Sequence, residues 1–74
     1  MRKEIIQERC KSANSWAVFV ERHAVFSDSS PVLRMKYDHL YMFKREDHAR
    51  NFSSNYSANN KFIVTNTGEL EKAA

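Results

Sequence analysis

Three histidines are the side chains of this chain whose ordinary pKa suits proton transfer near neutral pH. His23, His39 and His48 have carboxylates and arginines nearby in the sequence, so they could serve a small metal-free ribonuclease. The spacing does not require this chemistry, and a zinc site would need distant residues to converge, because Cys10 is the only cysteine. We therefore expect a non-catalytic protein without a metal or cofactor. The carboxylates and arginines considered with the histidines are Glu21, Asp38, Arg22 and Arg45.

Basic residues in the middle of the chain suggest a second chemistry, the binding of nucleic acid. Lysine and arginine contact phosphates, and exposed aromatic rings such as Tyr37, Tyr41 and Phe43 can stack on the bases of RNA or single-stranded DNA. The competing interpretation is that these rings belong to the core and the charges to a solvated face, because alternation places the rings opposite Arg34 and Lys36. The predicted nucleic-acid-binding residues are Arg34, Lys36, Lys44, Arg45 and Arg50.

Apolar side chains exceed what one face of a small three-stranded sheet can hide. Surplus apolar surface on a small domain marks a site for a partner or a second copy. The competing interpretation is that a second helix, for which residues 2–13 are available, covers the other face of the sheet. The residues predicted to contact a partner are Trp16, Phe19, Leu40 and Met42.

A strand that runs into a helix is expected to position most of these residues. Apolar and charged residues alternate over 32–38, which is the two-residue period of a strand with one dry face. Over 39–43 the alternation fades, which predicts burial on both faces or an interface. A helix is predicted over 45–57, with acidic residues in its first turn where the helix dipole favours them. The residues at helical spacing are Ala49, Phe52, Ser53 and Tyr56.

The clearest turn in the chain is residues 27–31, which are polar and end in the only proline. The preceding segment, 15–26, is rich in aromatic and β-branched residues, so we predict a hairpin of 15–26 with 32–43. A single long helix over 2–26 is the alternative, because small and apolar residues also repeat there in steps of four and three.

The remaining segments complete an α+β fold. Residues 2–13 are predicted to be helical, residues 61–65 to form a third strand, and residues 69–74 to be a frayed tail or a helical stub after a single domain over 1–68. The predicted order is α-β-β-α-β, with a three-stranded, mostly antiparallel sheet and one or two helices on one face.

Length and composition limit the possibilities further. A domain of 74 residues buries only roughly 60% of the surface that its unfolded chain exposes, so help from a second copy is plausible. No apolar run reaches the length of a membrane span, and the charged N-terminus lacks the apolar core of a signal peptide, so we expect a cytoplasmic protein away from membranes. The formal net charge of +3 is modest and favours anionic partners weakly.

In its size, α+β plan and lack of catalytic motifs, the chain resembles the accessory or inhibitory proteins that phages and mobile elements encode. The leading hypothesis from sequence is a nucleic-acid-binding module that acts as a homodimer. The resemblance implies the alternative, an inhibitor or adaptor that binds a protein, for example through an anionic surface of its partner or through an exposed sheet edge.

Overall fold

The computed structural model describes residues 2–21, 25–27, 30–34, 38–58 and 60–73, with the backbone alone described for 25–27 and 30–34. These described residues include two helices and six strands. Their bounds in order are α1 Lys3–Ala13, β1 Trp16–Val20, β2 Val25–Ser27, β3 Ser30–Arg34, β4 His39–Phe43, α2 Glu46–Asn55, β5 Lys61–Val64 and β6 Leu70–Ala73.

Four of the strands form an antiparallel sheet in the order β4-β1-β5-β6. β1 is paired on both sides, and its residues from Ala17 to Val20 are buried on both faces. The two outer strands are β4 and β6. β1 is therefore the centre of the fold, and β4 is an edge strand that follows it only after a long excursion of the chain.

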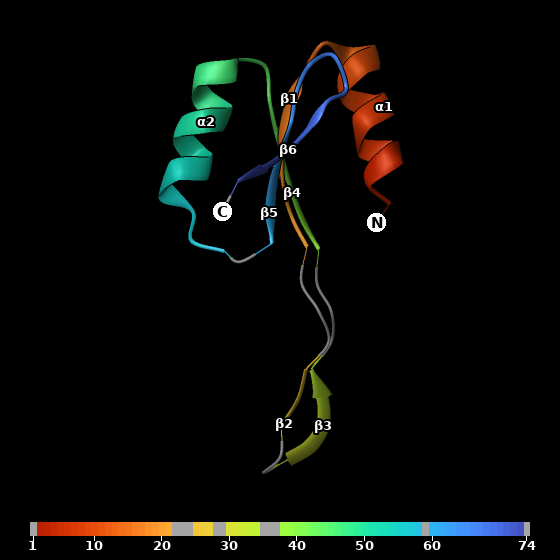
Figure 1. Ribbon diagram of the computed structural model, residues 1–74, viewed down its shortest axis with the longest axis vertical. Helices are drawn as coiled ribbons and strands as arrows, with labels where there is room; N and C mark the ends of the chain where they lie inside the picture. The colour runs from red at the N-terminus through yellow and green to blue at the C-terminus, as the bar shows by residue number, and fades with distance from the viewer. Residues whose placement is uncertain (1, 22–24, 28–29, 35–37, 59, 74) are drawn as a thin grey trace.

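That excursion is a second antiparallel pair, β2 with β3, which projects from one end of the sheet away from both helices (Figure 1). The pairing of β2 with β3 continues the register of the pairing of β1 with β4. Val20 pairs with His39 and Val25 pairs with Arg34, so four residues separate the paired positions on each side. The predicted hairpin of 15–26 with 32–43 is thus confirmed at its two described ends.

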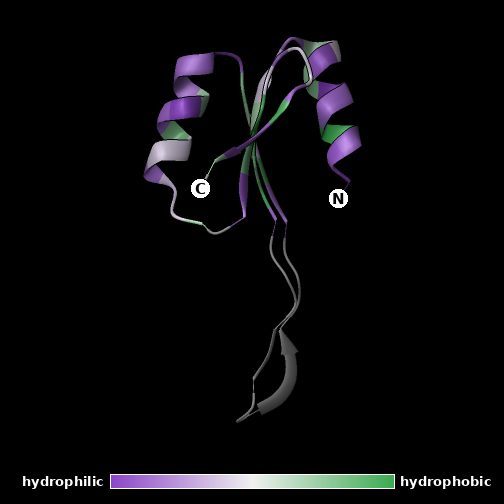
Figure 2. Ribbon diagram, in the orientation of Figure 1, coloured by the Kyte–Doolittle hydropathy of each residue, from purple (hydrophilic) through white to green (hydrophobic). Residues whose placement is uncertain are grey.

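The helices lie on opposite faces of the sheet (Figure 1). On one face, Ile6 and Cys10 of α1 pack against Ala17, Phe19 and Val64 of the sheet. Figure 2 shows the hydrophobic residues concentrated in the strands of the sheet, whereas the helices are mainly hydrophilic. Each helix therefore contributes a narrow apolar stripe and leaves the rest of its surface in water.

On the other face, α2 covers an aromatic cluster. The ring centroid of Phe52 lies 4.6 Å from that of Tyr41 and 5.3 Å from that of Phe43, and both of these partners belong to β4. Tyr56 joins the cluster at 5.6 Å from Tyr41. Rings at these separations pack in the tilted arrangements that aromatic pairs prefer.

Local sequence explains where the helices end. Asn14 follows α1 with φ 49° and ψ 48°, the left-handed conformation that asparagine tolerates, and its backbone N–H closes the helix on Cys10. At α2, Glu46 and Asp47 fill the first turn, as the helix dipole favours, and Arg45 in front of them provides no side-chain cap.

Three expectations from sequence are corrected. The sheet has four strands, because Leu70–Ala73 form β6 rather than a frayed tail or a helical stub. The helices cover both faces of the sheet rather than one. The alternative of one long helix over 2–26 is excluded, since α1 ends at Ala13 and β1 follows. Within the described ranges, no helix is long and apolar enough to cross a membrane.

Candidate functional site

Two of the predicted nucleic-acid-binding arginines are engaged with carboxylates. Arg45 donates two hydrogen bonds to the Asp47 carboxylate, from Nε to Oδ1 at 3.0 Å and from Nη2 to Oδ2 at 2.8 Å. Arg50 Nε donates to Glu46 at 2.8 Å, and Arg50 Nη1 donates to Glu71 of β6 at 3.1 Å. Such pairs neutralise much of the charge that a phosphate would need.

The pKa values agree with this pairing. Hydrogen bonds from its guanidinium to Glu71 and Glu46 raise the pKa of Arg50 above its ordinary value. Desolvation works to raise the pKa of the Asp47 carboxyl, but the hydrogen bonds and charge of Arg45, with the charge of His48, outweigh it and lower that pKa.

The other three basic residues are less constrained. Lys44 lies in the bend between β4 and α2, is exposed, and has no ion pair within the described residues. Arg34 ends β3, where the backbone alone is described, and Lys36 lies outside the described residues. Of the three whose side chains the structure describes, Arg45 and Arg50 are thus paired with carboxylates, and Lys44 alone has no ion pair in that part of the chain.

Two of the four residues predicted to contact a partner belong to the interior or are covered. Phe19 is fully buried in the core under α1, so its side chain is not on the surface of this structure. Trp16 is half-buried, and the Arg50 guanidinium stands over its ring at 5.5 Å from the centroid. Both residues serve the packing of this chain rather than an open surface.

The other two, Leu40 and Met42, lie together on the edge strand β4. They alternate with Tyr41, so they share the face that α1 occupies, but α1 makes its main contacts with β1 and β5 and covers β4 only in part. Met42 is 41% exposed and Leu40 is half-buried against the core. β4 thus presents an apolar strip beside the backbone N–H and C=O groups of a sheet edge.

The two edges of the sheet differ in a way that matters for binding. β6 carries Glu71, which is tied to Arg50, and Lys72, which stands over the Phe62 ring. β4 has no Lys, Arg, Asp or Glu over its five residues. Charged residues are the usual protection of a sheet edge against pairing, so β4 is the unprotected edge.

A second cluster of possible function surrounds Phe62 on the face of α1. Lys3 Nζ lies 4.5 Å from the centroid of this half-buried ring, and Lys72 Nζ lies 5.3 Å from it. Lys3 also pairs with Glu21 at 3.5 Å. Two ammonium groups beside one ring resemble the aromatic and basic elements that bind single-stranded nucleic acid.

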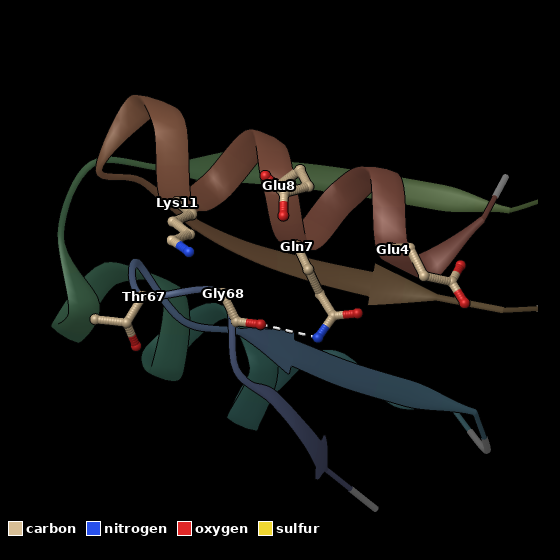
Figure 3. A pocket seen from close by; sticks show the side chains of 6 residues that line it. All are labelled: Glu4, Gln7, Glu8, Lys11, Thr67 and Gly68. Carbon is tan, nitrogen blue, oxygen red and sulfur yellow. Dashed lines mark hydrogen bonds between the residues drawn. The ribbon is translucent and has the colours of Figure 1, made fainter.

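A hollow lies between α1 and the turn before β6 (Figure 3). It measures about 270 Å³ and is open to solvent. Gln7 Nε2 donates a 2.8 Å hydrogen bond to the Gly68 carbonyl across its floor. This contact holds α1 against the turn, so the packing of the helix on the turn accounts for the residues around the hollow. Its walls are Glu4, Gln7, Glu8, Lys11, Thr67 and Gly68.

The histidines provide no assembled catalytic group within the described part of the chain. His39 lies in β4 with its ring stacked on Tyr41 at 6.3 Å, and His48 is exposed on α2. His23 lies outside the described residues. Among the described residues, no three His, Cys, Asp or Glu side chains are placed to hold a metal ion.

The fading alternation over 39–43 predicted burial on both faces or an interface. In the structure β4 is half-buried at four positions and exposed at Met42, so its burial is partial, and the contact role of Leu40 and Met42 stays a prediction. Nothing in local sequence says which strand lies at an edge, or that Lys3 and Lys72 meet at Phe62. Neither a protein-family model, nor a curated protein, nor a solved structure matches the chain.

Proposed function

We propose that this protein is a binding module that docks on another polypeptide by adding a strand to the open edge of β4. The observation that carries the proposal is the position of β4 as an outer strand of the described sheet, with no Lys, Arg, Asp or Glu over its five residues and with Met42 41% exposed. In strand addition, backbone hydrogen bonds supply affinity and alternate side chains supply specificity.

The side chains of β4 suit this mode of binding. Leu40 and Met42 give an incoming strand apolar contacts on one face, while on the other Tyr41 and Phe43 are fixed by the α2 cluster. A strand held by this packing is ordered before binding, which lowers the entropic cost of association.

The experiment compares two exposed apolar residues on the two edges. Met42→Glu places a charge on the β4 edge, and Leu70→Glu places the same charge on β6, where Leu70 is 37% exposed. Tagged chains would be used to capture partners from cells after nuclease treatment. Docking at β4 is supported if the wild type and Leu70→Glu capture a protein after nuclease treatment and Met42→Glu does not. Capture unchanged in Met42→Glu contradicts it.

Nucleic-acid binding is the second candidate, and the pair of lysines at Phe62 is the observation in its favour. It is the weaker candidate because Arg45 and Arg50 are committed to carboxylates. If RNA or single-stranded DNA binds here, Lys3→Ala with Lys72→Ala weakens binding to unrelated sequences alike, and affinity falls steeply with salt. Affinity that is unchanged by salt argues against this candidate.

A further inference from the structure

We propose that the strand docked on β4 is β4 of a second copy of this chain, paired antiparallel about Tyr41. This inference rests on the proposed function and adds the identity of the partner. A two-fold axis perpendicular to the sheet would join the two four-stranded sheets into one of eight strands, in which β4 is no longer an edge. The proposal is argued from the register that the sequence of β4 allows.

Apolar residues meet apolar residues when the pairing is centred on Tyr41. Leu40 then stands opposite Met42 of the partner subunit, and the symmetry repeats this pair on the other side of the axis. Directly opposed residues on one face of an antiparallel pair are in close contact. Four side chains would therefore cover the strip that α1 leaves open, including the exposed part of Met42.

Charges at the two ends of β4 match in the same register. Asp38 precedes the strand and Lys44 follows it, so Asp38 stands opposite Lys44 of the partner subunit at each end of the pairing. Lys44 is exposed and has no ion pair within the described residues. Asp38 already has a partner in its own chain and its Oδ1 is buried, so a further donor has to reach the other carboxylate oxygen, Oδ2; a carboxylate has about four lone-pair directions for such donors.

The neighbouring registers fail this match. Residues opposite each other must lie on the same face, so the pairing can move only in steps that preserve the faces. Centred on Leu40, the pairing places Asp38 opposite Met42 of the partner subunit. Centred on Met42, it places Leu40 opposite Lys44 of the partner subunit. Each alternative sets a charge against an apolar side chain, so the register about Tyr41 is the one that the sequence selects.

Mass in solution tests self-pairing directly. In analytical ultracentrifugation over a concentration range from about 5 to about 500 µM, the wild type should rise from 8.7 kDa toward twice that mass, because five-residue edges make a small, reversible interface. Met42→Glu should stay at 8.7 kDa, and Leu70→Glu should behave as wild type. Circular dichroism on each variant confirms that the fold survives.

Charge exchange tests the register. Lys44→Glu alone sets Glu against Asp38 of the partner subunit, and Asp38→Lys alone sets Lys against Lys44 of the partner subunit, so each chain should dimerise at least tenfold more weakly than wild type. Mixing the two chains pairs opposite charges at both ends and should restore a heterodimer. Chains that dimerise unchanged, or a mixture that stays monomeric, overturn the register.

The outcomes separate this inference from the proposed function. A wild type that stays at 8.7 kDa throughout overturns self-pairing, whatever else it binds. If Met42→Glu then still abolishes capture of another protein, docking at β4 stands with a different partner. If capture is also unaffected, both proposals fail.

Discussion

Lys61 closes the C-terminal end of α2 by donating its ammonium hydrogens to the backbone carbonyl of Ser53. The same ammonium donates to the Tyr56 carbonyl at 2.8 Å, although the residue is only 6% exposed. The last carbonyls of a helix have no partner within the helix. Lys61 of β5 gives the Ser53 carbonyl, which also accepts the backbone N–H of Tyr56, a second donor, and it binds the carbonyl of Tyr56, the residue that follows α2. The contact fixes α2 on the sheet and thereby positions the aromatic rings that hold β4.

Replacing this lysine should destabilise the fold. Lys61→Met keeps the hydrocarbon stem but removes the ammonium, so the Tyr56 carbonyl loses this donor and the Ser53 carbonyl keeps only the backbone N–H of Tyr56. We expect the free energy of unfolding to fall by about 1–2 kcal/mol. Urea denaturation measures the change. Lys72→Met, on the neighbouring strand and exposed, is the matched control and should cost less than about 0.5 kcal/mol. Equal effects of the two changes would show that the carbonyl contacts contribute little.

Arg50 joins α2 to β6 and shields the only tryptophan of the chain. In Arg50→Ala, Trp16 should become more exposed, so its fluorescence emission should move to longer wavelength. The exposed ion pairs should account for less than about 1 kcal/mol of unfolding free energy, and less at high salt. Arg45→Ala removes a local pair and should leave the emission unchanged. An unshifted emission in Arg50→Ala would mean that the guanidinium does not cover the ring.

Gly68 sits in the turn between β5 and β6 with φ +87°, a conformation that other residues adopt with strain. A Cβ there would lie 3.3 Å from the backbone oxygen of Gln7, so α1 would also have to give way. We expect Gly68→Ala to cost about 1–2 kcal/mol in thermal or urea unfolding. Glu69→Ala, at the exposed next position, should be nearly neutral. A neutral Gly68→Ala would show that the turn relaxes without strain.

Cys10 reports on the core between α1 and the sheet. Burial raises the pKa of its thiol, against a smaller opposing effect of the Arg9 charge. Because the folded state holds the proton more tightly, the unfolded thiol ionises first, and this residue's contribution to stability is lost as pH rises past the ordinary thiol pKa. The stability difference between wild type and Cys10→Ala should therefore narrow from pH 7 to about pH 10. A difference that is constant with pH would contradict this.

Local patterns predicted the parts of the fold that depend on neighbouring residues. The helix predicted over 45–57 is α2 at Glu46–Asn55, and the strand predicted over 61–65 is β5 at Lys61–Val64. The polar turn at 27–31 and the equal lengths of its flanking segments were enough to pair β1 with β4. In each case the information lies within one periodic stretch or one turn.

Features that depend on distant contacts escaped prediction. Leu70–Ala73 carry few strand-forming residues, and β6 exists because β5 offers it a partner and Arg50 holds Glu71. The face of the sheet that each helix covers depends on how the chain connects the strands, and the hydrophobic periodicity of a segment carries no information about these connections. Arg45 and Arg50, which the sequence predicted to contact phosphates, pair with carboxylates instead. One of these carboxylates, Glu71, lies 21 residues from Arg50 in the sequence.

The register that these two strand pairings share, β1 with β4 and β2 with β3, bears on how quickly this chain can fold. Forming β1 against β4 from the open chain would close a loop over residues 21–38, whereas after β2 has paired with β3 only four residues remain on each side. Because the entropy of loop closure grows with loop length, pairing of β2 with β3 can come first and bring β1 and the edge strand β4 together in steps. Lengthening the turn between Ser27 and Ser30 should then slow refolding while leaving the unfolding rate nearly unchanged.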